Sequence, residues 1–330
     1  MLRKTLLITL LIALMTACAP QATPTAVSSQ GAPAATEIVV TEAPPTEAPT
    51  AAPTGITVTD GLGREVKLDG PAQHVVSLAP SNTEILFAIG AGSQVVGRDQ
   101  LSDYPEEAKA VKDIGSSFEA LNTELIVSLK PDLVIAAEIN TAEQVKQLED
   151  LGLTVYYLKN PTTLEELYSN LEIVAQLTGH ENETATLIDS LKTRVAAVDA
   201  KIAPISSRPS VFYELDATDP AKPYTAGKGT FITQLIERAG GHNVAADIDG
   251  YPQLSLEQVV ADDPAFIILG DSAYGVTPET IAARPGWDKL SAVKNNKIFP
   301  FDDNLVSRPG PRLVDALEQL AKLLRPELFQ

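Results

Sequence analysis

The stretch Asn122-Thr-Glu-Leu-Ile-Val-Ser-Leu-Lys-Pro-Asp-Leu-Val-Ile135 aligns without a gap with Ser255-Leu-Glu-Gln-Val-Val-Ala-Asp-Asp-Pro-Ala-Phe-Ile-Ile268. Each copy starts with a residue that commonly caps a helix, continues as a short helical pattern and stops at a proline. An apolar strand pattern then follows in both copies, and Glu124 of the first matches Glu257 of the second. The sequence therefore predicts two lobes that share one plan.

Strand and helix patterns alternate on both sides of the first copy. The sequence predicts strands at 74–78, 95–97, 133–136 and 154–158, and helices at 80–90, 123–129 and 142–151. Ser81 and Glu84 have the spacing of a capping box, and Gly90 is expected to end that helix. After the second copy, residues 288–301 again give a helix and a strand. Such alternation is typical of α/β lobes with parallel sheets.

The segment 163–202 lacks a strand pattern and separates the two lobes. Apolar residues recur in it at helical spacing, first at Leu164, Leu167, Leu171 and Val174, then at Leu187, Leu191, Val195 and Val198. We expect an α/β fold with two Rossmann-like lobes of parallel sheet, at 57–160 and 206–330, joined by a long rigid helix within 161–205. Little lobe movement is expected, and a ligand is expected in the crevice between the lobes.

Residues 1–17 read as a secretory signal that ends at a lipid attachment site. Arg3 and Lys4 supply the positive start, and an apolar core of about ten residues follows, which is too short to span a bilayer. Small residues then precede Cys18, as in a bacterial lipobox. We expect Cys18 to be acylated, and we expect the Ala-, Pro- and Thr-rich segment 18–56 to be a disordered linker.

Composition and motif content exclude several classes of function. A net charge of −18 opposes binding to nucleic acid. The single cysteine allows no intrachain disulfide, and three scattered histidines, His74, His180 and His242, make a metal site unexpected. No Gly-x-Ser-x-Gly motif is present, and the Gly-Lys pair at Lys228 lacks the first glycine of a P-loop. We therefore expect a protein that is not an enzyme and that contains no cofactor.

Six further stretches carry a family resemblance. They are Val76-Ser-Leu-Ala-Pro-Ser-Asn-Thr-Glu84, Ser102-Asp-Tyr-Pro105, Ser128-Leu-Lys-Pro-Asp-Leu-Val-Ile-Ala136, Tyr224-Thr-Ala-Gly-Lys228, Gly240-Gly-His-Asn243 and Pro252-Gln-Leu-Ser-Leu-Glu-Gln-Val259. Together they resemble the substrate-binding proteins of cobalamin, haem and ferric-siderophore ABC importers, over residues 56–324. The Pro-Ser-Asn-Thr-Glu run favours the cobalamin branch. The resemblance implies the class III periplasmic-binding-protein fold.

The resemblance also implies partners and site residues. It implies an extracytoplasmic, lipid-anchored monomer that passes its ligand to an ABC permease dimer with an ATPase. Glu124 and Glu257 are the implied permease-docking residues. The implied ligand-binding residues are Pro80, Ser81, Asn82, Tyr104, Phe118, Tyr224, Asp303 and Arg308. A corrinoid is the implied ligand; a ferric siderophore or haem, and a ligand-sensing or adhesion lipoprotein, stay as alternatives.

Some positions depart from the cobalamin branch. Leu101, Leu305 and Val306 stand where aromatic residues are usual, and Phe118 replaces a tryptophan. Other aromatic residues are candidates to compensate, namely Tyr104, Tyr251, Tyr274 and Trp287. For an anionic siderophore only Arg98 and Arg308 look well placed, and for haem Tyr104 is the candidate axial ligand.

Overall fold

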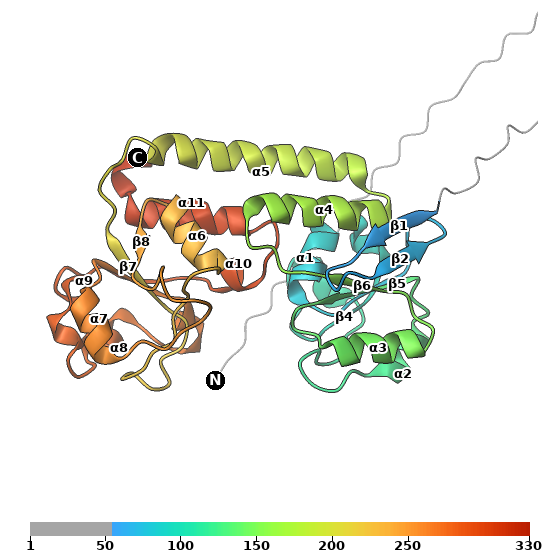
Figure 1. The fold of residues 1–330 in the computed structure, drawn as a ribbon, viewed down its shortest axis with the longest axis horizontal. Helices are drawn as coiled ribbons and strands as arrows, with labels where there is room; N and C mark the ends of the chain where they lie inside the picture. The colour runs from blue at the N-terminus through green and yellow to red at the C-terminus, as the bar shows by residue number, and fades with distance from the viewer. Residues whose placement is uncertain (1–54) are drawn as a thin grey trace, which may run out of the picture. The chain divides into compact units, whose positions relative to one another are not determined.

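A parallel β-sheet forms the centre of each lobe in the computed structural model, which describes residues 55–330 (Figure 1). The predicted signal peptide, Cys18 and the linker up to residue 54 lie outside the described residues. The sheet of the N-terminal lobe has the order β4-β3-β5-β6, and all of its strands are parallel. These strands are β3 (Val75–Ser77), β4 (Val95–Arg98), β5 (Leu133–Ala137) and β6 (Val155–Leu158).

Helices α1 (Pro80–Ala88), α2 (Thr123–Ser128) and α3 (Ala142–Asp150) belong to this lobe. An antiparallel hairpin of β1 (Ile56–Thr59) and β2 (Glu65–Leu68) precedes the sheet. Strand β1 starts at Ile56, the last residue that the sequence assigned to the linker.

The C-terminal lobe repeats the topology of the first. Its sheet has the order β8-β7-β9-β10, again all parallel, so β7 corresponds to β3 and β9 to β5. The strands are β7 (Ser210–Glu214), β8 (His242–Asn243), β9 (Phe266–Leu269) and β10 (Ile298–Pro300). The helices are α6 (Phe231–Arg238), α7 (Leu256–Asp262), α8 (Pro278–Ala282), α9 (Ser291–Lys294) and α10 (Asn304–Ser307).

The sequence repeat is confirmed as a structural repeat. The side chain of Asn122 caps α2 and that of Ser255 caps α7, each by accepting a backbone N–H at 3.2 Å. At the residue before each proline, Lys130 and Asp263 both adopt the left-handed conformation, with φ of 50° and 39°. This backbone conformation is uncommon for residues other than glycine. Its occurrence at matching positions shows that the two units leave their helices by the same turn.

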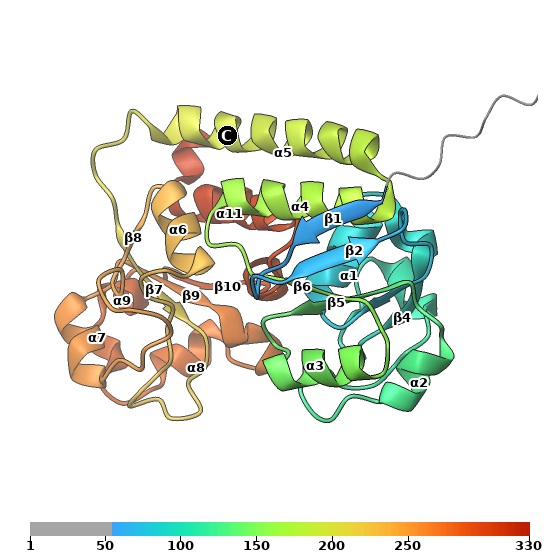
Figure 2. The same ribbon diagram turned by 45° about the vertical axis from the view of Figure 1, so that its right-hand side comes forward.

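Three helices join the lobes. Helix α4 (Leu164–Thr178) ends at Gly179, which has a φ of 79°, and α5 (Glu181–Ile202) then runs along both lobes in both views (Figures 1 and 2). Helix α11 (Leu313–Leu324) lies beneath α5, and Arg194 of α5 contacts Glu318 of α11 at 2.9 Å. The expected long interlobe helix is therefore confirmed.

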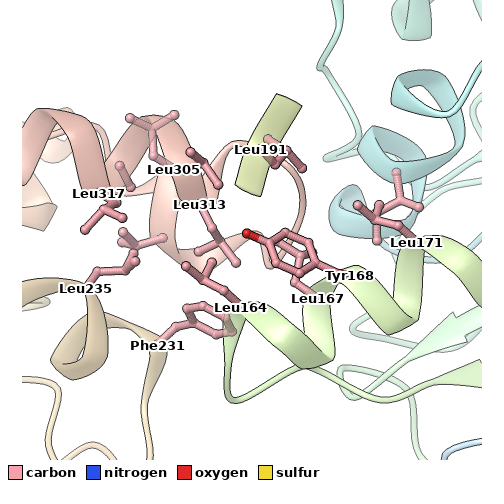
Figure 3. Packing of buried hydrophobic residues seen from close by; sticks show 14 of the residues in the cluster. Leu164, Leu167, Tyr168, Leu171, Leu191, Phe231, Leu235, Leu305, Leu313 and Leu317 are labelled. Carbon is pink, nitrogen blue, oxygen red and sulfur yellow. The ribbon is translucent and has the colours of Figure 1, made fainter. Parts of the chain in front are cut away.

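One apolar core continues from lobe to lobe through these helices. Figure 3 shows Leu164, Leu167 and Leu171 of α4 beside Leu191 of α5 and Leu313 of α11. The same cluster of buried residues extends to β3 in one lobe and β7 in the other, whereas two smaller clusters each belong to a single lobe. Opening the lobes widely would expose this shared core to water, which supports the expectation of limited movement.

The capping box predicted at Ser81 and Glu84 is wrong. Helix α1 starts at Pro80, so its N-cap is Ala79, two residues before Ser81, and Ala79 has no side-chain hydrogen bond. Proline suits this first position because it lacks the N–H that would otherwise need a partner. The end of the helix agrees with the prediction, since Gly90 follows it in the left-handed conformation. The Glu84 carboxylate is used elsewhere, between the lobes.

Candidate ligand-binding crevice

Two adjoining hollows lie between the lobes. The first, which we call the aromatic hollow, has a volume of about 330 Å³ and contains exposed side chains from both lobes. Its N-terminal wall is Ala79, Pro80, Ser81, Leu101, Phe118, Ala137, Ile139 and Asn160; its C-terminal wall is Tyr274, Asp303, Asn304, Ser307, Arg308 and Pro309. Pro80 and Ser81 are there because α1 starts just beyond the carboxyl end of β3, where ligands of α/β sheets commonly bind.

The second hollow shares Asn160, Ser307 and Pro309 with the first. Its volume is also about 330 Å³, and it adds the carboxylate of Glu138 and the ring of Tyr251. Because the hollows share a wall, a single large ligand can reach both. Their separate volumes fall within the usual range for small-molecule sites.

Large apolar side chains stay unburied in this crevice. Phe118 is 62% exposed and Tyr274 is 89% exposed, and they come from opposite lobes. Leu101 in the same hollow is 44% exposed. Burial of an aromatic ring removes a large apolar area from water and is therefore strongly favourable. Exposed rings on two facing walls are thus expected in a site that binds a ligand with broad apolar faces.

Five of the eight predicted ligand-binding residues line the aromatic hollow, namely Pro80, Ser81, Phe118, Asp303 and Arg308. The predicted residue Asn82 lines neither hollow. It is buried, and its side-chain amide donates to the Ile135 carbonyl oxygen at 3.0 Å. The geometry gives Asn82 a structural role, in which it holds α1 to β5.

Tyr104 and Tyr224 also lie outside the lining of both hollows. The Arg312 guanidinium group lies 3.9 Å from the centre of the Tyr104 ring and covers one of its faces. Tyr224 pairs through its backbone with Asp216 and Gln253. In the aromatic hollow, the aromatic residue of the C-terminal wall is therefore Tyr274. The sequence analysis offered Tyr274 only as one of four residues that could replace the missing aromatic contacts.

The other compensating and basic residues have different positions. Trp287 is buried in the C-terminal lobe, edge-to-face with Phe212 at 6.1 Å, so its compensating role is wrong. Leu305 and Val306 are both buried in the interlobe core, and Val306 also lines the second hollow. Arg98 is buried too, and it donates to the backbone oxygens of its own lobe. The placement predicted for Arg98 in the crevice is therefore wrong.

A four-residue ion cluster joins the lobes beside the aromatic hollow. The Arg312 guanidinium group binds Glu84 through two hydrogen bonds of 2.8 and 2.5 Å, and Arg308 donates to Asp103 at 2.6 Å. Arg308 also lies 3.5 Å from Glu84. We define these four residues as the interlobe ion cluster; sequence reasoning missed all of it except Arg308.

The environment shifts the pKa of both acids of this cluster. Burial raises the pKa of Glu84 above its ordinary value, although the two arginines partly offset this effect. For Asp103 the balance is reversed: burial acts to raise its pKa, but the hydrogen bond and charge of Arg308 outweigh it and lower the pKa. Asp103 is therefore a firm carboxylate partner of Arg308.

The polar residue Asp303 is fixed from beneath. The hydroxyl of buried Tyr213 donates to its carboxylate at 2.7 Å, and Ser307 donates to the other oxygen. Burial, with the charge of Asp303, raises the pKa of Tyr213, so its hydroxyl stays a donor. The Asp303 carboxylate in the crevice is consequently held in one orientation.

The predicted docking residues Glu124 and Glu257 occupy equivalent places on the two lobes. Each is the second residue of its helix, α2 or α7, and each is exposed. Both helices lie on the side of the lobes that faces away from α5 (Figures 1 and 2). Among residues 55–330, neither glutamate forms an ion pair.

Two other features are absent from the described part of the chain. No helix there is long and apolar enough to cross a membrane. No group of acids and histidines there could hold a metal ion.

Known proteins are similar in sequence to this chain over most of its length. The chain is 35% identical over 280 residues to an uncharacterised ABC transporter substrate-binding lipoprotein of Bacillus subtilis, with 83% of this chain and 87% of that protein covered. It is 32% identical over 274 residues to a cobalamin-binding protein of Halobacterium salinarum, with 81% and 73% covered.

Solved structures match the fold as well. A periplasmic vitamin B12 binding protein of Vibrio cholerae aligns with a TM-score of 0.67 at 30% identity, covering 79% of this chain and 99% of that one. A periplasmic heme-binding protein of Roseiflexus aligns with a TM-score of 0.69 at 30% identity, covering 78% and 99%. The family model described as periplasmic binding protein matches residues 75–305. The chain belongs to this family, as a substrate-binding protein of an ABC transporter.

Proposed function

We propose that this protein is a lipid-anchored extracytoplasmic receptor that binds a corrinoid in the crevice and delivers it to an ABC permease dimer with its ATPase. One observation carries the choice of ligand. The arginine side chains beside the crevice are already paired with carboxylates of the protein, whereas exposed aromatic rings on both walls are free. Such a crevice suits a broad ligand with apolar faces and little net negative charge.

The charge balance argues against strongly anionic ligands. Many ferric siderophores carry several negative charges and need unpaired cations. Here Arg308 and Arg312 face Asp103 and Glu84, and the crevice adds two further carboxylates, Asp303 and Glu138. A buried anion without a cation partner is costly, so each added carboxylate disfavours an anionic ligand.

Haem is disfavoured by a different feature. Tyr104, the candidate axial ligand, lies outside the hollows and has the Arg312 guanidinium group against its ring. An axial ligand needs an open phenol oxygen directed at the ligand-binding space. The relatives named for cobalamin or vitamin B12 support the corrinoid, while the heme-binding neighbour keeps haem as the natural competitor in any test.

The delivery part of the proposal depends on the paired glutamates. Symmetric docking on two permease subunits requires equivalent acids on the two lobes, and Glu124 and Glu257 meet this requirement. Cys18 would supply the anchor, and the Bacillus relative is itself named a lipoprotein. We propose a monomer, because each lobe contributes one wall and one glutamate to a complete unit.

Titration of the purified soluble domain tests the ligand. Cyanocobalamin, haem and an anionic ferric tricatecholate are all coloured, so equilibrium dialysis with absorbance readout of the ligand retained by the protein compares all three. We expect micromolar or tighter binding of cyanocobalamin and at least tenfold weaker binding of the tricatecholate. Binding of haem or the tricatecholate in preference to cyanocobalamin would overturn the corrinoid assignment. Corrinoid binding without any effect of a gene deletion on uptake would instead favour the sensing or adhesion alternative.

A further inference from the structure

We infer that Asp103 is a specificity-determining residue: its carboxylate occupies the anion-binding position of Arg308 and so makes the crevice select against anionic ligands. The inference rests on the proposed function in one respect, namely that the crevice is the ligand site. It adds a cause for the selectivity, which is a carboxylate of the protein acting as an internal competitor.

The contact between Asp103 and Arg308 connects the two lobes. Asp103 belongs to the N-terminal lobe, between β4 and α2, whereas Arg308 follows α10 in the C-terminal lobe. Their contact of 2.6 Å uses the Nη1 atom of Arg308, which is also a lining residue of the aromatic hollow. An anionic group that entered this hollow would need the same guanidinium group.

The two acids of the interlobe ion cluster differ in exposure and in the number of hydrogen bonds that they accept from their arginines. Glu84 has only 2% of its side chain exposed and meets Arg312 through two hydrogen bonds, so it is fixed. Asp103 has 57% of its side chain exposed and makes one hydrogen bond to Arg308. Only the Asp103 side of this pair is exposed, because Arg308 has 15% of its side chain exposed, so the melting temperature of Asp103→Asn without citrate measures what the substitution costs the fold.

Removal of the Asp103 charge changes the net charge of the interlobe ion cluster. Two guanidinium groups and two carboxylates make the cluster neutral. Loss of the Asp103 charge leaves Arg308 with Glu84 alone at 3.5 Å, while Glu84 is already bound by Arg312. Asp99 stays engaged with Ser102 and the Leu101 N–H, and Asp303 with Tyr213. The cluster then carries one unmatched positive charge at the wall of the hollow, which attracts anions.

The test uses citrate as the anionic probe and the soluble domain with the substitution Asp103→Asn. Affinity is measured from the rise in melting temperature with citrate at constant ionic strength, since a ligand that binds the folded state stabilises it. Glu106→Gln is the matched control, because it removes the same charge from an exposed ion pair, with Lys109, in the same segment. The double variant Asp103→Asn with Arg308→Gln shows whether any gain acts through Arg308.

We expect citrate affinity to increase at least tenfold in Asp103→Asn, to stay unchanged in Glu106→Gln, and to return to the original value in the double variant. Equal citrate affinity in the original protein and Asp103→Asn overturns the inference, as does a gain that survives in the double variant. The cyanocobalamin titration of the unaltered protein is read separately. Its failure would remove the proposed ligand, whereas a missing citrate gain beside normal cyanocobalamin binding would remove only the role of Asp103.

Discussion

Glu84 of α1 and Arg312, immediately before α11, lie 228 positions apart in the sequence and yet hold the two lobes together through two hydrogen bonds. The exposed fractions of their side chains are only 2% and 13%. A buried pair of this kind is costly to break from one side, because the remaining charge keeps its burial but loses its partner. The pair therefore gives a direct measure of how strongly the lobes are coupled.

Substitution of Glu84 by Ala should lower the free energy of unfolding by about 3 kcal/mol, since Arg312 is left without its carboxylate. Urea denaturation followed by circular dichroism measures this change. Asp150→Ala is the control, because it breaks the exposed pair with Lys146 on α3 and should change stability by less than about 0.5 kcal/mol. A loss in Glu84→Ala as small as that expected for the control would show that the interlobe pair adds nothing to stability.

Local sequence signals located the repeated helix–strand units and the long interlobe helix, but not the β1–β2 hairpin or α11. Cap residues, prolines and the period of apolar residues act over a few positions, and they located α2, α7, β5 and β9 in both lobes. The continuous apolar stripe of 187–198 likewise located α5. Even so, the left-handed turn at Lys130 and Asp263 carried no signal, because neither residue type requires that conformation.

The crevice was only partly predictable, because its walls come from segments that are distant in sequence. Ser81 and Glu84 have a spacing that suits a cap, but in the folded protein the carboxylate of Glu84 binds Arg312 of the other lobe. From the sequence alone, Tyr224 and Tyr274 are equally suitable as aromatic contacts for a ligand. The packing of the C-terminal lobe places only Tyr274 in the hollow. Tertiary contacts of this range leave no local pattern.

Asp271 should make stability depend on pH. Its carboxylate is buried without a hydrogen-bond partner among the described residues, beside Glu214, which binds Arg284 at 2.6 and 2.8 Å. Burial, and then the charge of Glu214, raise the pKa of Asp271 from 3.8 to about 7, while Arg284 partly opposes the shift. The folded state therefore holds this proton more tightly than the unfolded chain does. Its stabilising effect is complete below about pH 4 and is lost as the pH rises through about 7.

In Asp271→Asn this part of the pH dependence should disappear. Urea midpoints at several pH values between 4 and 8 measure the loss, which at about 1.4 kcal/mol per pKa unit is on the order of 4 kcal/mol in the original protein. Asp262→Asn, at an exposed position of α7, serves as control and should keep the original slope. An unchanged slope in Asp271→Asn would assign the pH dependence to other groups.

Cys18 is predicted to hold the protein at the membrane. Cys18→Ala should release the full-length chain into the soluble fraction, because the acyl chain has no other attachment site among the residues of this sequence, which contains one cysteine. Fractionation with an antibody after a high-salt wash measures the release. Ligand affinity of the released protein should equal that of the anchored form. Retention of the variant in the membrane would place the anchor elsewhere.

Glu124 and Glu257 are predicted to act in delivery and not in ligand binding. Reversal of both to Arg should abolish uptake in cells, because basic docking pockets would then face positive charge. Ligand affinity should be unchanged, and exposed substitutions of this kind cost less than about 0.5 kcal/mol of stability.

The matched control for docking reverses Glu165 and Glu181. These are also exposed acids in the first turns of helices, but on α4 and α5, at the other side of the molecule (Figure 1). Their reversal alters the net charge equally and should leave uptake intact. Equal loss of uptake in both double variants would attribute the effect to net charge and not to docking.

Phe118 and Tyr274 are predicted to form the two aromatic walls that hold the ligand. Each ring is largely exposed in the crevice and comes from a different lobe, so a ligand between them covers both. Phe118→Ala and Tyr274→Ala should each weaken cyanocobalamin binding by about tenfold, which corresponds to roughly 1.4 kcal/mol per ring. Tyr224→Ala is the control for an exposed tyrosine of the same lobe outside the hollow, and its affinity should change less than twofold. Calorimetric titration of the three variants separates the two arrangements: a large loss in Tyr224→Ala with none in Tyr274→Ala would show that the ligand binds toward Tyr224, and would remove the aromatic hollow as the site.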